Sequence, residues 1–244
     1  MPIMIFSYKE LKKFYKKIKS LGDTLLFREF INQKCFLIRH DIDWDLNAAV
    51  NLSILENKTS IKSTYFVMVN TNNYNVLSEV NKNRIRKIKS LGHEIALHFD
   101  ASLYDNNFEK NAINESKILE NIVDTKIESI SLHNPSENGI YPEFKNFNNA
   151  YSKKYFANET YMSDSRFSFR DKEPFKFIQE IKYKPFLQIL LHPLHYSDDG
   201  STNYIEIFQR LLKNRLIEFD NYQMMNTKYK TDRLKNNYRI ELGE

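Results

Sequence analysis

The sequence predicts an α/β fold, a distorted (β/α) barrel with about seven parallel strands in a single domain. Short apolar runs alternate with longer amphipathic segments, which is typical of parallel strands joined by crossover helices. A chain of 244 residues can bury one sizeable core, and it contains no internal repeat and no low-complexity linker. Four of the apolar runs end in Asp or His, a pattern typical of the active face of such a fold.

The first predicted element is a helix within residues 1–34, which should form a helical extension before the barrel. Ser7 and Glu10 have the spacing of a capping box, so the helix should begin there, continue to about residue 20 and end at Gly22. Buried strands are expected where apolar, β-branched and aromatic residues cluster, at 35–38, 63–69, 94–97, 127–132 and 186–191. Amphipathic spacing predicts helices at 46–56, 76–91, 108–123, 174–181 and 204–216.

Residues 134–172 are the least regular stretch and should form a long loop region over one face of the barrel. Residues 220–244 are expected to be a basic C-terminal tail. Asp45 is the predicted cap of the helix at 46–56. Residues 1–244 as a whole are predicted to be one catalytic domain.

The chain is basic, with a formal net charge of +5 and a pI of about 9.0. Its basic residues are scattered apart from a group near the C-terminal end, and no arginine stripe is interleaved with aromatic residues. We therefore expect no nucleic-acid partner. The charge would suit an anionic small substrate, such as a nucleotide-linked sugar, but a Lys-rich composition without any particular partner explains it as well.

The expected location is the cytoplasm. No apolar run reaches the roughly 20 residues that cross a bilayer, so no membrane span is predicted. Residues 1–19 are interrupted by lysines and lack the apolar core of a signal peptide. The single cysteine, Cys35, excludes an internal disulfide and fits a reducing compartment.

The histidines lie close to the ends of predicted strands. All six fall in or beside four short segments, 36–43, 92–98, 130–133 and 189–193. Because the C-terminal ends of parallel strands meet on one face, the Asp and His side chains at these ends should converge there. His192 precedes Pro193, so its strand should end there and leave the imidazole at the rim.

The spacing within the segments indicates which side chains share the site. Asp41 and Asp43 are two residues apart, so an extended backbone directs both carboxylates the same way, and a shared cation would relieve their repulsion. A turn followed by a helix cap is the alternative reading of this pair. His93 and His98 are five apart and face opposite ways in one strand. His98, at the C-terminal end, is the site candidate, and His93 should be structural.

A site of histidines and carboxylates without cysteine predicts one catalytic divalent ion, most simply zinc, with cobalt or nickel as alternatives. Such an ion lowers the pKa of a bound water molecule and polarises a carbonyl group.

These segments, in this order, resemble the motifs of the polysaccharide deacetylase family, carbohydrate esterase family four. The resemblance extends over about residues 36–192. The segments that carry it are Arg39-His40-Asp41-Ile42-Asp43, Thr64-Tyr65-Phe66, Gly92-His93-Glu94-Ile95-Ala96-Leu97-His98 and Leu190-Leu191-His192. The resemblance implies that Asp41 is the general base and that His192 is the general acid. It also implies that Asp43 and His98 bind the metal.

The chain departs from the family pattern at the third metal ligand. Ser102 stands where the family has a second metal-binding histidine, and the family's Arg-x-Pro motif, whose Arg steadies the base, corresponds here to residues 133–135, which begin with a histidine. The economical reading is that His133 completes a site of two histidines and one carboxylate. Asp100, two residues after His98, is the competing third ligand.

Three further residues are candidates for contact with the substrate. Residues 162–166 loosely match the family's fourth motif, so Asp164 and Arg166 are expected to support the site or to bind substrate. Trp44, the only tryptophan, follows the aspartate pair and could stack on a sugar ring, with ordinary packing as the alternative.

The implied activity is the hydrolysis of an N-acyl group, most simply N-acetyl, from an amino sugar. A cytoplasmic location favours a nucleotide- or lipid-linked precursor of a surface polysaccharide over a cell-wall polymer. Two alternatives stay open: a metal-dependent phosphoesterase, which would more often use two ions, and a catalytically inactive carbohydrate-binding relative. The sequence does not predict the oligomeric state.

Overall fold

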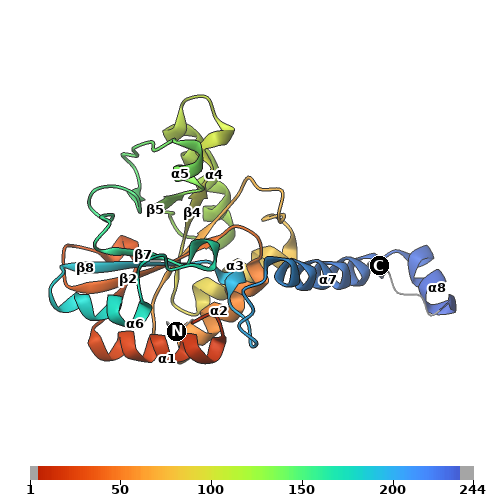
Figure 1. Ribbon diagram of the computed structural model, residues 1–244. Helices are drawn as coiled ribbons and strands as arrows, with labels where there is room; N and C mark the ends of the chain where they lie inside the picture. The colour runs from red at the N-terminus through yellow and green to blue at the C-terminus, as the bar shows by residue number, and fades with distance from the viewer. Residues whose placement is uncertain (1–4, 237–244) are drawn as a thin grey trace. The chain divides into compact units, whose positions relative to one another are not determined.

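The computed structural model describes residues 5–236. The chain divides into two compact units, Met1–Gly200 and Ser201–Glu244. The first unit contains the sheet and the helices that cover it (Figure 1). The second contains α7 (Tyr204–Gln223) and α8 (Thr227–Asn236), so the barrel lies in the first unit and the stretch predicted as a tail is partly helical. Its last eight residues, 237–244, lie outside the described residues.

The first unit is built on one sheet in which the strands run parallel. Its order is β6-β5-β4-β3-β2-β8-β7, and β1 pairs with the first half of β2. The bounds are β1 Thr24–Leu25, β2 Cys35–Ile42, β3 Thr64–Val67, β4 Glu94–Phe99, β5 Ser129–Leu132, β6 Asn148–Asn149, β7 Tyr161–Ser163 and β8 Phe186–Leu191. The seven strands on this path curl into a half-barrel surrounded by helices, which confirms the predicted distorted (β/α) barrel (Figure 1). Among the described strands, β6 and β7 are the two edges and do not pair with each other.

Two of the helices begin at residues that the sequence marks as caps. The helices of the first unit are α1 Tyr8–Leu21, α2 Leu46–Lys58, α3 Glu79–Ser90, α4 Phe108–Val123, α5 Pro135–Asn138 and α6 Pro174–Phe177. The Ser7 hydroxyl accepts a hydrogen bond from the backbone N–H of Glu10, and the Asp45 carboxylate accepts two at the start of α2. Both caps were predicted. None of the described helices combines the length and the apolar character that crossing a bilayer requires.

Two parts of the first unit are more regular than the sequence predicted. The extension at 1–34 contributes a strand, because β1 pairs with β2 through Thr24 and Phe36. The stretch 134–172 contains α5 and the two edge strands β6 and β7 in addition to loops. These strands are two and three residues long, too short to show a period-2 pattern in the sequence.

Alternation along the strands separates an apolar layer from a more polar one. Outward-facing residues such as Tyr65, Leu97 and Ile130 belong to a large hydrophobic cluster with residues of α2, α3 and α4. Inward-facing residues, among them Leu37 and Phe66, form a second, largely aromatic cluster. On β2 the inward positions change from Cys35 and Leu37 to Arg39 and Asp41, and the last inward position of β4 is His98, so polar groups gather near the C-terminal ends of these two strands.

Glu115 on α4 gives the first unit a pH-dependent stability. The side chain accepts a hydrogen bond from the Tyr104 hydroxyl at 2.5 Å, and burial raises its pKa to about 7. An unfolded glutamate titrates near 4.3, so the folded chain retains this proton at a pH where the unfolded chain has lost it. The contribution of this group to the free energy of unfolding is therefore lost as the pH rises from about 4.5 through 7.

Replacing Glu115 by Gln should remove this dependence, since Gln keeps the acceptor for Tyr104 and cannot ionise. We expect urea unfolding at pH 5, 6, 7 and 8 to show that the free energy of unfolding of the variant rises relative to that of the unaltered protein as the pH increases. The difference should grow by up to about 3 kcal/mol at pH 8. Glu143→Gln, at an exposed position, is the matched control and should follow the unaltered protein. Parallel curves for all three proteins would contradict the prediction.

Candidate functional site

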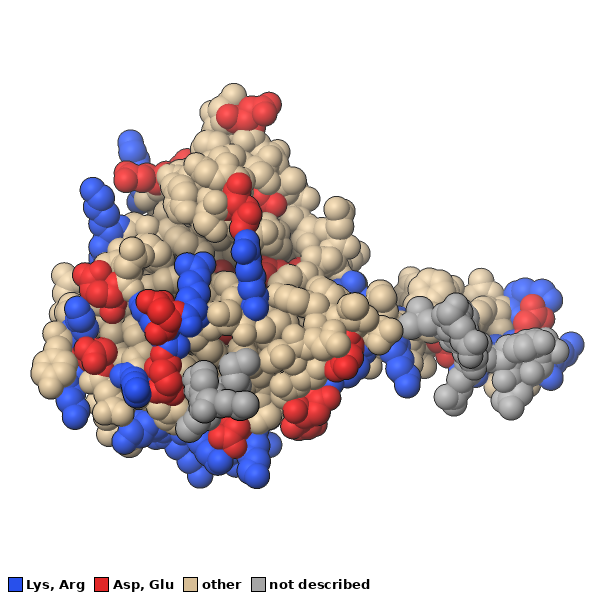
Figure 2. Space-filling model, in the orientation of Figure 1, with Lys and Arg blue, Asp and Glu red and all other residues tan. Residues whose placement is uncertain are grey.

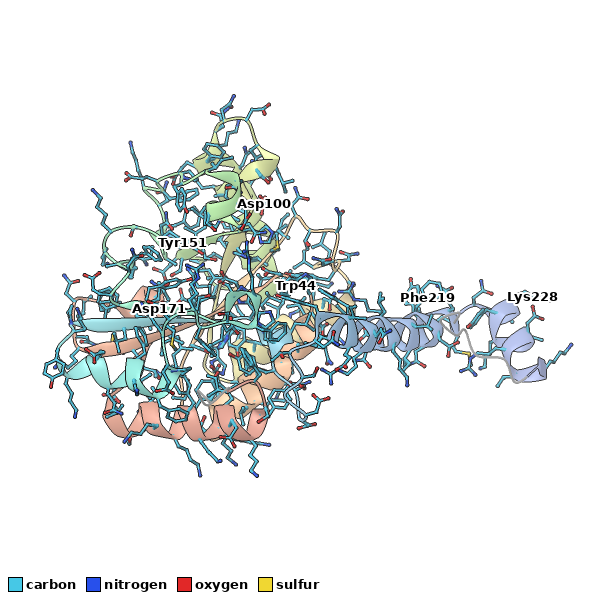
Figure 3. The ribbon with its side chains drawn as sticks, viewed as in Figure 1. Trp44, Asp100, Tyr151, Asp171, Phe219 and Lys228 are labelled. Carbon is cyan, nitrogen blue, oxygen red and sulfur yellow. The ribbon has the colours of Figure 1, made fainter. Side chains whose placement is uncertain are left out.

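The side chains predicted to carry chemistry meet at the C-terminal ends of the strands. Asp41 lies near the end of β2 and Asp43 just beyond it, His98 is on β4, and His133 and His192 directly follow β5 and β8. A cleft of about 330 Å³ opens over all five. Its walls include four aromatic side chains, Tyr141, Tyr151, Phe156 and Tyr161. Figure 3 labels Tyr151 together with Trp44 and Asp100.

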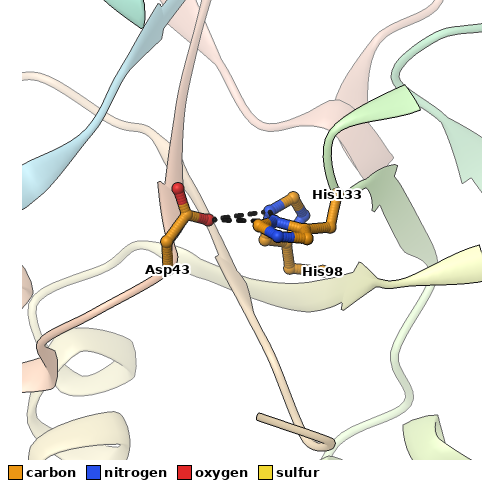
Figure 4. A group of neighbouring side chains, drawn as sticks. All are labelled: Asp43, His98 and His133. Atoms are coloured by element: carbon orange, nitrogen blue, oxygen red, sulfur yellow. Dashed lines mark hydrogen bonds and ion pairs between the residues drawn. The ribbon is translucent and has the colours of Figure 1, made fainter. Parts of the chain in front are cut away.

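Asp43, His98 and His133 form a compact group (Figure 4). The Oδ1 atom of Asp43 lies 3.0 Å from Nε2 of His98 and 3.5 Å from Nδ1 of His133, and these two ring nitrogens are 3.4 Å apart. Two imidazole nitrogens and a carboxylate oxygen directed at one point are a donor set that zinc and other first-row divalent ions accept. The other ring nitrogen of His98 lies 2.7 Å from the Ser131 hydroxyl, which fixes the ring orientation. The residues present therefore fit one divalent ion.

The charges in this group are coupled. Burial by itself would raise the pKa of Asp43, but hydrogen bonds from His133 and His98, with the nearby charge of His192, hold it well below its usual range. Burial by itself would lower the pKa of His133, but the hydrogen bond and charge of Asp43 outweigh burial and raise the pKa of this imidazole. Asp43 is thus a carboxylate throughout the neutral range, as a metal ligand must be.

Asp41 is buried beside this group and is held by two side chains. Its Oδ2 atom lies 3.3 Å from Nη2 of Arg39, and its Oδ1 accepts a hydrogen bond of 3.2 Å from the Ser131 hydroxyl. Arg39 is itself fully buried, with its guanidinium 4.6 Å from the centre of the Tyr151 ring. Ser131 contacts both Asp41 and His98, so one hydroxyl links the predicted base to a predicted metal ligand.

His192 is held in the site by Asp164. Nδ1 of His192 lies 2.6 Å from Oδ1 of Asp164, whose carboxylate also accepts from the backbone N–H of His192 and lies 3.2 Å from Nδ1 of His195. Burial would lower the pKa of His192, but the charge and hydrogen bond of Asp164, with the charge of Asp43, raise it to about 9. Its Nε2 faces the site, 3.8 Å from Oδ2 of Asp43. At neutral pH the imidazole carries the proton that a general acid needs.

The remaining predicted residues lie around this centre. Asp100 caps the 3-10 helix Ala101–Leu103, and its Oδ1 accepts from the backbone N–H and hydroxyl of Ser102. Its carboxylate is not part of the group formed by Asp43 and the two histidines. The Trp44 ring packs 6.3 Å from the His192 ring, a distance between ring centres.

Arg166 and His93 are not among the residues that line the cleft. The Arg166 side chain is exposed and pairs with Glu137, and its backbone is in the left-handed region; Ser165, the residue before it, does line the cleft. His93 faces the helical side of the sheet, where its ring nitrogens contact the Ser63 hydroxyl and the Ser53 carbonyl. Its predicted structural role is confirmed.

Three supporting residues were missed by sequence reasoning. Arg39 faces the same side of β2 as Asp41, and Ser131 faces the same side of β5 as His133, because residues two apart in a strand point the same way. A charged or polar residue two positions before a candidate could therefore have predicted both. His195 follows β8 and is brought to Asp164 by the chain after the strand, which no spacing rule predicts.

Comparison with known proteins gave matches among solved structures alone. No model of a known protein family matches the chain, and no curated protein matches it. The chain is similar to a polysaccharide deacetylase from Bacillus cereus, with 14% identity over 74% of this chain and 87% of that one and a TM-score of 0.44. It is similar to a family 4 carbohydrate esterase from Bacillus anthracis, with 12% identity, 83% and 86% coverage and a TM-score of 0.44. A CE4 family pseudoenzyme from Bacillus anthracis has 13% identity and a TM-score of 0.42, with 75% of this chain and 62% of that chain covered.

These solved structures come from the family that the motifs resemble, and they include both enzymes and pseudoenzymes. The chain spans less than two thirds of the length of the pseudoenzyme. At this level of similarity the structures assign neither a substrate nor a reaction to the chain.

The third ligand can be tested by metal affinity. His133→Ala should weaken zinc binding to the chelator-treated protein by at least about 100-fold, because it removes a donor atom from the group, whereas Asp100→Asn should leave the affinity unchanged. Titration against a competing zinc-binding dye measures both. A large loss in Asp100→Asn with little change in His133→Ala would reverse the assignment.

The role of Ser131 can be separated from general packing. Ser131→Ala should lower zinc affinity by about 10- to 100-fold, since His98 loses the partner that fixes its ring. Ser129→Ala is the matched control, because Ser129 lies on the same strand with the same parity and donates to Glu94 instead. Equal affinities in the two variants would show that Ser131 does not orient the ligand.

Proposed function

We propose that this chain is a metal-dependent hydrolase that removes an N-acyl group, most simply N-acetyl, from an amino sugar. The observation that supports it most is that a carboxylate, Asp41, and an imidazole, His192, both lie against the group formed by the candidate ligands Asp43, His98 and His133. Asp41 lies against His98, with Oδ2 3.9 Å from Nε2, and His192 lies against the other oxygen of Asp43. Hydrolysis of an amide requires a base and an acid close to the bound ion, and these two side chains contact different ligand atoms.

The residues of the chain have distinct parts in this reaction. Asp43, His98 and His133 would hold one divalent ion, which when bound polarises the amide carbonyl and lowers the pKa of water. Asp41 accepts the proton of the attacking water at a carboxylate that Arg39 and Ser131 keep in place. His192 donates its Nε2 proton to the nitrogen of the departing amine, and Asp164 holds the ring in the orientation that allows this. Without that proton the leaving group would be an amide anion, far too basic to depart.

We further propose that the substrate is a nucleotide- or lipid-linked amino sugar, a cytoplasmic precursor of a surface polysaccharide. The aromatic walls of the cleft offer flat surfaces on which a sugar ring can stack. The net charge of +5 suits a diphosphate-linked substrate. Figure 2 shows Lys and Arg side chains spread over the visible face with Asp and Glu among them, rather than gathered in the continuous basic stripe that nucleic acid would require.

A phosphoesterase is the second candidate, and one observation bears on it. Asp164, His192 and His195 form another group that could accept an ion, which a two-metal mechanism would need. However, both oxygens of Asp164 already accept hydrogen bonds from the backbone N–H of His192, and each lies within 3.2 Å of a ring nitrogen. The group is better suited to holding an acid than a second ion, so we favour amide hydrolysis.

The first test is the metal content of the purified, chelator-free protein by elemental mass spectrometry. About one zinc, cobalt or nickel per chain is expected. The loaded protein should then release acetate from N-acetylated amino sugars, offered free and as nucleoside diphosphate conjugates. Asp41→Asn and His192→Asn should each lower kcat by about 100- to 10,000-fold while retaining the metal. Asp100→Asn is the control and should stay active.

Three results would contradict the proposal. No bound metal, even after zinc is offered back, would exclude the hydrolase. Two ions per chain with cleavage of an aryl phosphate ester would favour the phosphoesterase. Sugar binding without release of acetate would identify an inactive carbohydrate-binding relative.

A further inference from the structure

A buried polar network lies behind the site, on the helical side of the sheet, and takes no part in the chemistry proposed above. At its centre is Glu56 of α2, which is fully buried. Its Oε1 lies 2.7 Å from Nε2 of His40, and its Oε2 accepts hydrogen bonds from the hydroxyls of Ser63 at 2.5 Å and Tyr65 at 2.7 Å. His93 borders the network, with Nδ1 3.7 Å from Oε2.

The network contains a charged carboxylate at a fully buried position, where desolvation of the charge costs free energy. Burial by itself would raise the pKa of Glu56, but the charge and hydrogen bond of His40 hold it at about 2. An aliphatic residue at this position of α2 would contribute to the hydrophobic cluster without that desolvation cost. A buried charge pair of this kind is explained more readily by a geometric role than by stability alone.

His40 connects the network to both halves of the reaction. In the chain it directly precedes Asp41, the proposed base. Its Nδ1 donates a hydrogen bond of 3.1 Å to the carbonyl oxygen of Leu191, the residue directly before His192, the proposed acid. His40 and Leu191 are also the last partners in the pairing of β2 with β8. The His40 ring therefore adds a side-chain hydrogen bond at the point where the pairing of β2 with β8 ends, directly before Asp41 and His192.

The topology of the sheet makes this position decisive. The base and the proposed ligands come from β2, β4 and β5, whereas the acid and its partner Asp164 follow β8 and β7. Among the described strands, β6 and β7 are the two edges of the sheet and do not pair with each other. The sheet therefore joins these two groups only through the pairing of β2 with β8. A change at the end of that pairing would alter the separation of base and acid while leaving the ligand group intact.

We propose that His40, held by Glu56, is a positioning residue that sets the distance between the base Asp41 and the acid His192. The inference rests on the proposed function, since it assigns those two roles. His40 touches neither substrate nor metal ligands and acts through the Leu191 carbonyl.

The test compares His40→Gln with His93→Gln in the zinc-loaded full chain. Gln at position 40 loses the Nδ1–H donor to Leu191, whereas Gln at position 93 disturbs the same network without touching a strand that carries the base or the acid. We expect His40→Gln to lower kcat by about 10- to 100-fold with KM and zinc affinity within about twofold, because a displacement of about 1 Å is enough for such a loss. His93→Gln should lower the thermal midpoint to a similar extent and leave kcat within about twofold.

Crystal structures of the two variants give a readout that does not depend on turnover. The Leu191 carbonyl and the His192 ring should be displaced from Asp41 in His40→Gln and stay in place in His93→Gln. If His40→Gln does not fold, Glu56→Gln, which keeps acceptors for Ser63 and Tyr65, takes its place with a smaller loss of kcat and a displacement in the same direction.

The outcomes separate the inference from the function on which it rests. Unchanged kcat and an unmoved His192 in His40→Gln would overturn the positioning role, as would an equal loss of kcat in His93→Gln. If the unaltered zinc-loaded chain released no acetate, the proposed function would fail, and the displacement of His192 in the crystal structures would still decide whether His40 sets its position.

Discussion

Two carboxylates, Asp41 and Asp43, lie buried side by side on one face of β2 and its extension, and the other charged groups of the site are arranged around them. Like charges at that spacing repel, and burial makes each of them costly. Asp41 pairs with Arg39 and accepts a hydrogen bond from the Ser131 hydroxyl. The imidazoles of His98, His133 and His192 lie close to Asp43. Each partner comes from the inward face of a parallel strand or from the residues directly after one, so the half-barrel is the scaffold that brings these charges together.

The alternation of the strands confines this charge to one side of the sheet. On β4 and β5, the inward positions apart from Ala96 are polar (Glu94, His98, Ser129 and Ser131), whereas the outward positions are apolar and pack beneath the helices. β2 breaks the rule at His40, whose outward imidazole would be unsatisfied among apolar side chains. Glu56 on the covering helix satisfies it, so one polar residue on the outer face required a second on the helix above.

Much of the site was predictable because it depends on local order. The period-2 pattern and the end of each apolar run located Asp41, Asp43, His98, His133 and His192, and the structure brings these five together. The supports depend on contacts between residues far apart in the chain, such as Ser131 with Asp41, and no single-sequence rule reports those. The role predicted for Arg166 stays a prediction: its backbone is in the left-handed region (φ 60°) and its exposed side chain pairs with Glu137, a contact that no motif in the sequence indicates. The edge strands β6 and β7 were missed because a strand of two or three residues is too short to show a periodic pattern in the sequence.

An open half-barrel divides the proposed reaction between two groups of strands. The ligands and the base are fixed by β2, β4 and β5, which are joined through β3 by continuous pairing, so their mutual geometry is well determined. The acid depends on β8 and on Asp164 after β7, beyond the single junction with β2. In the proposed reaction, metal binding and proton donation would therefore depend on different parts of the sheet. If the proposed function holds, a substitution that loosens the junction would abolish turnover while the metal stays bound, because the proposed ligands do not depend on β8.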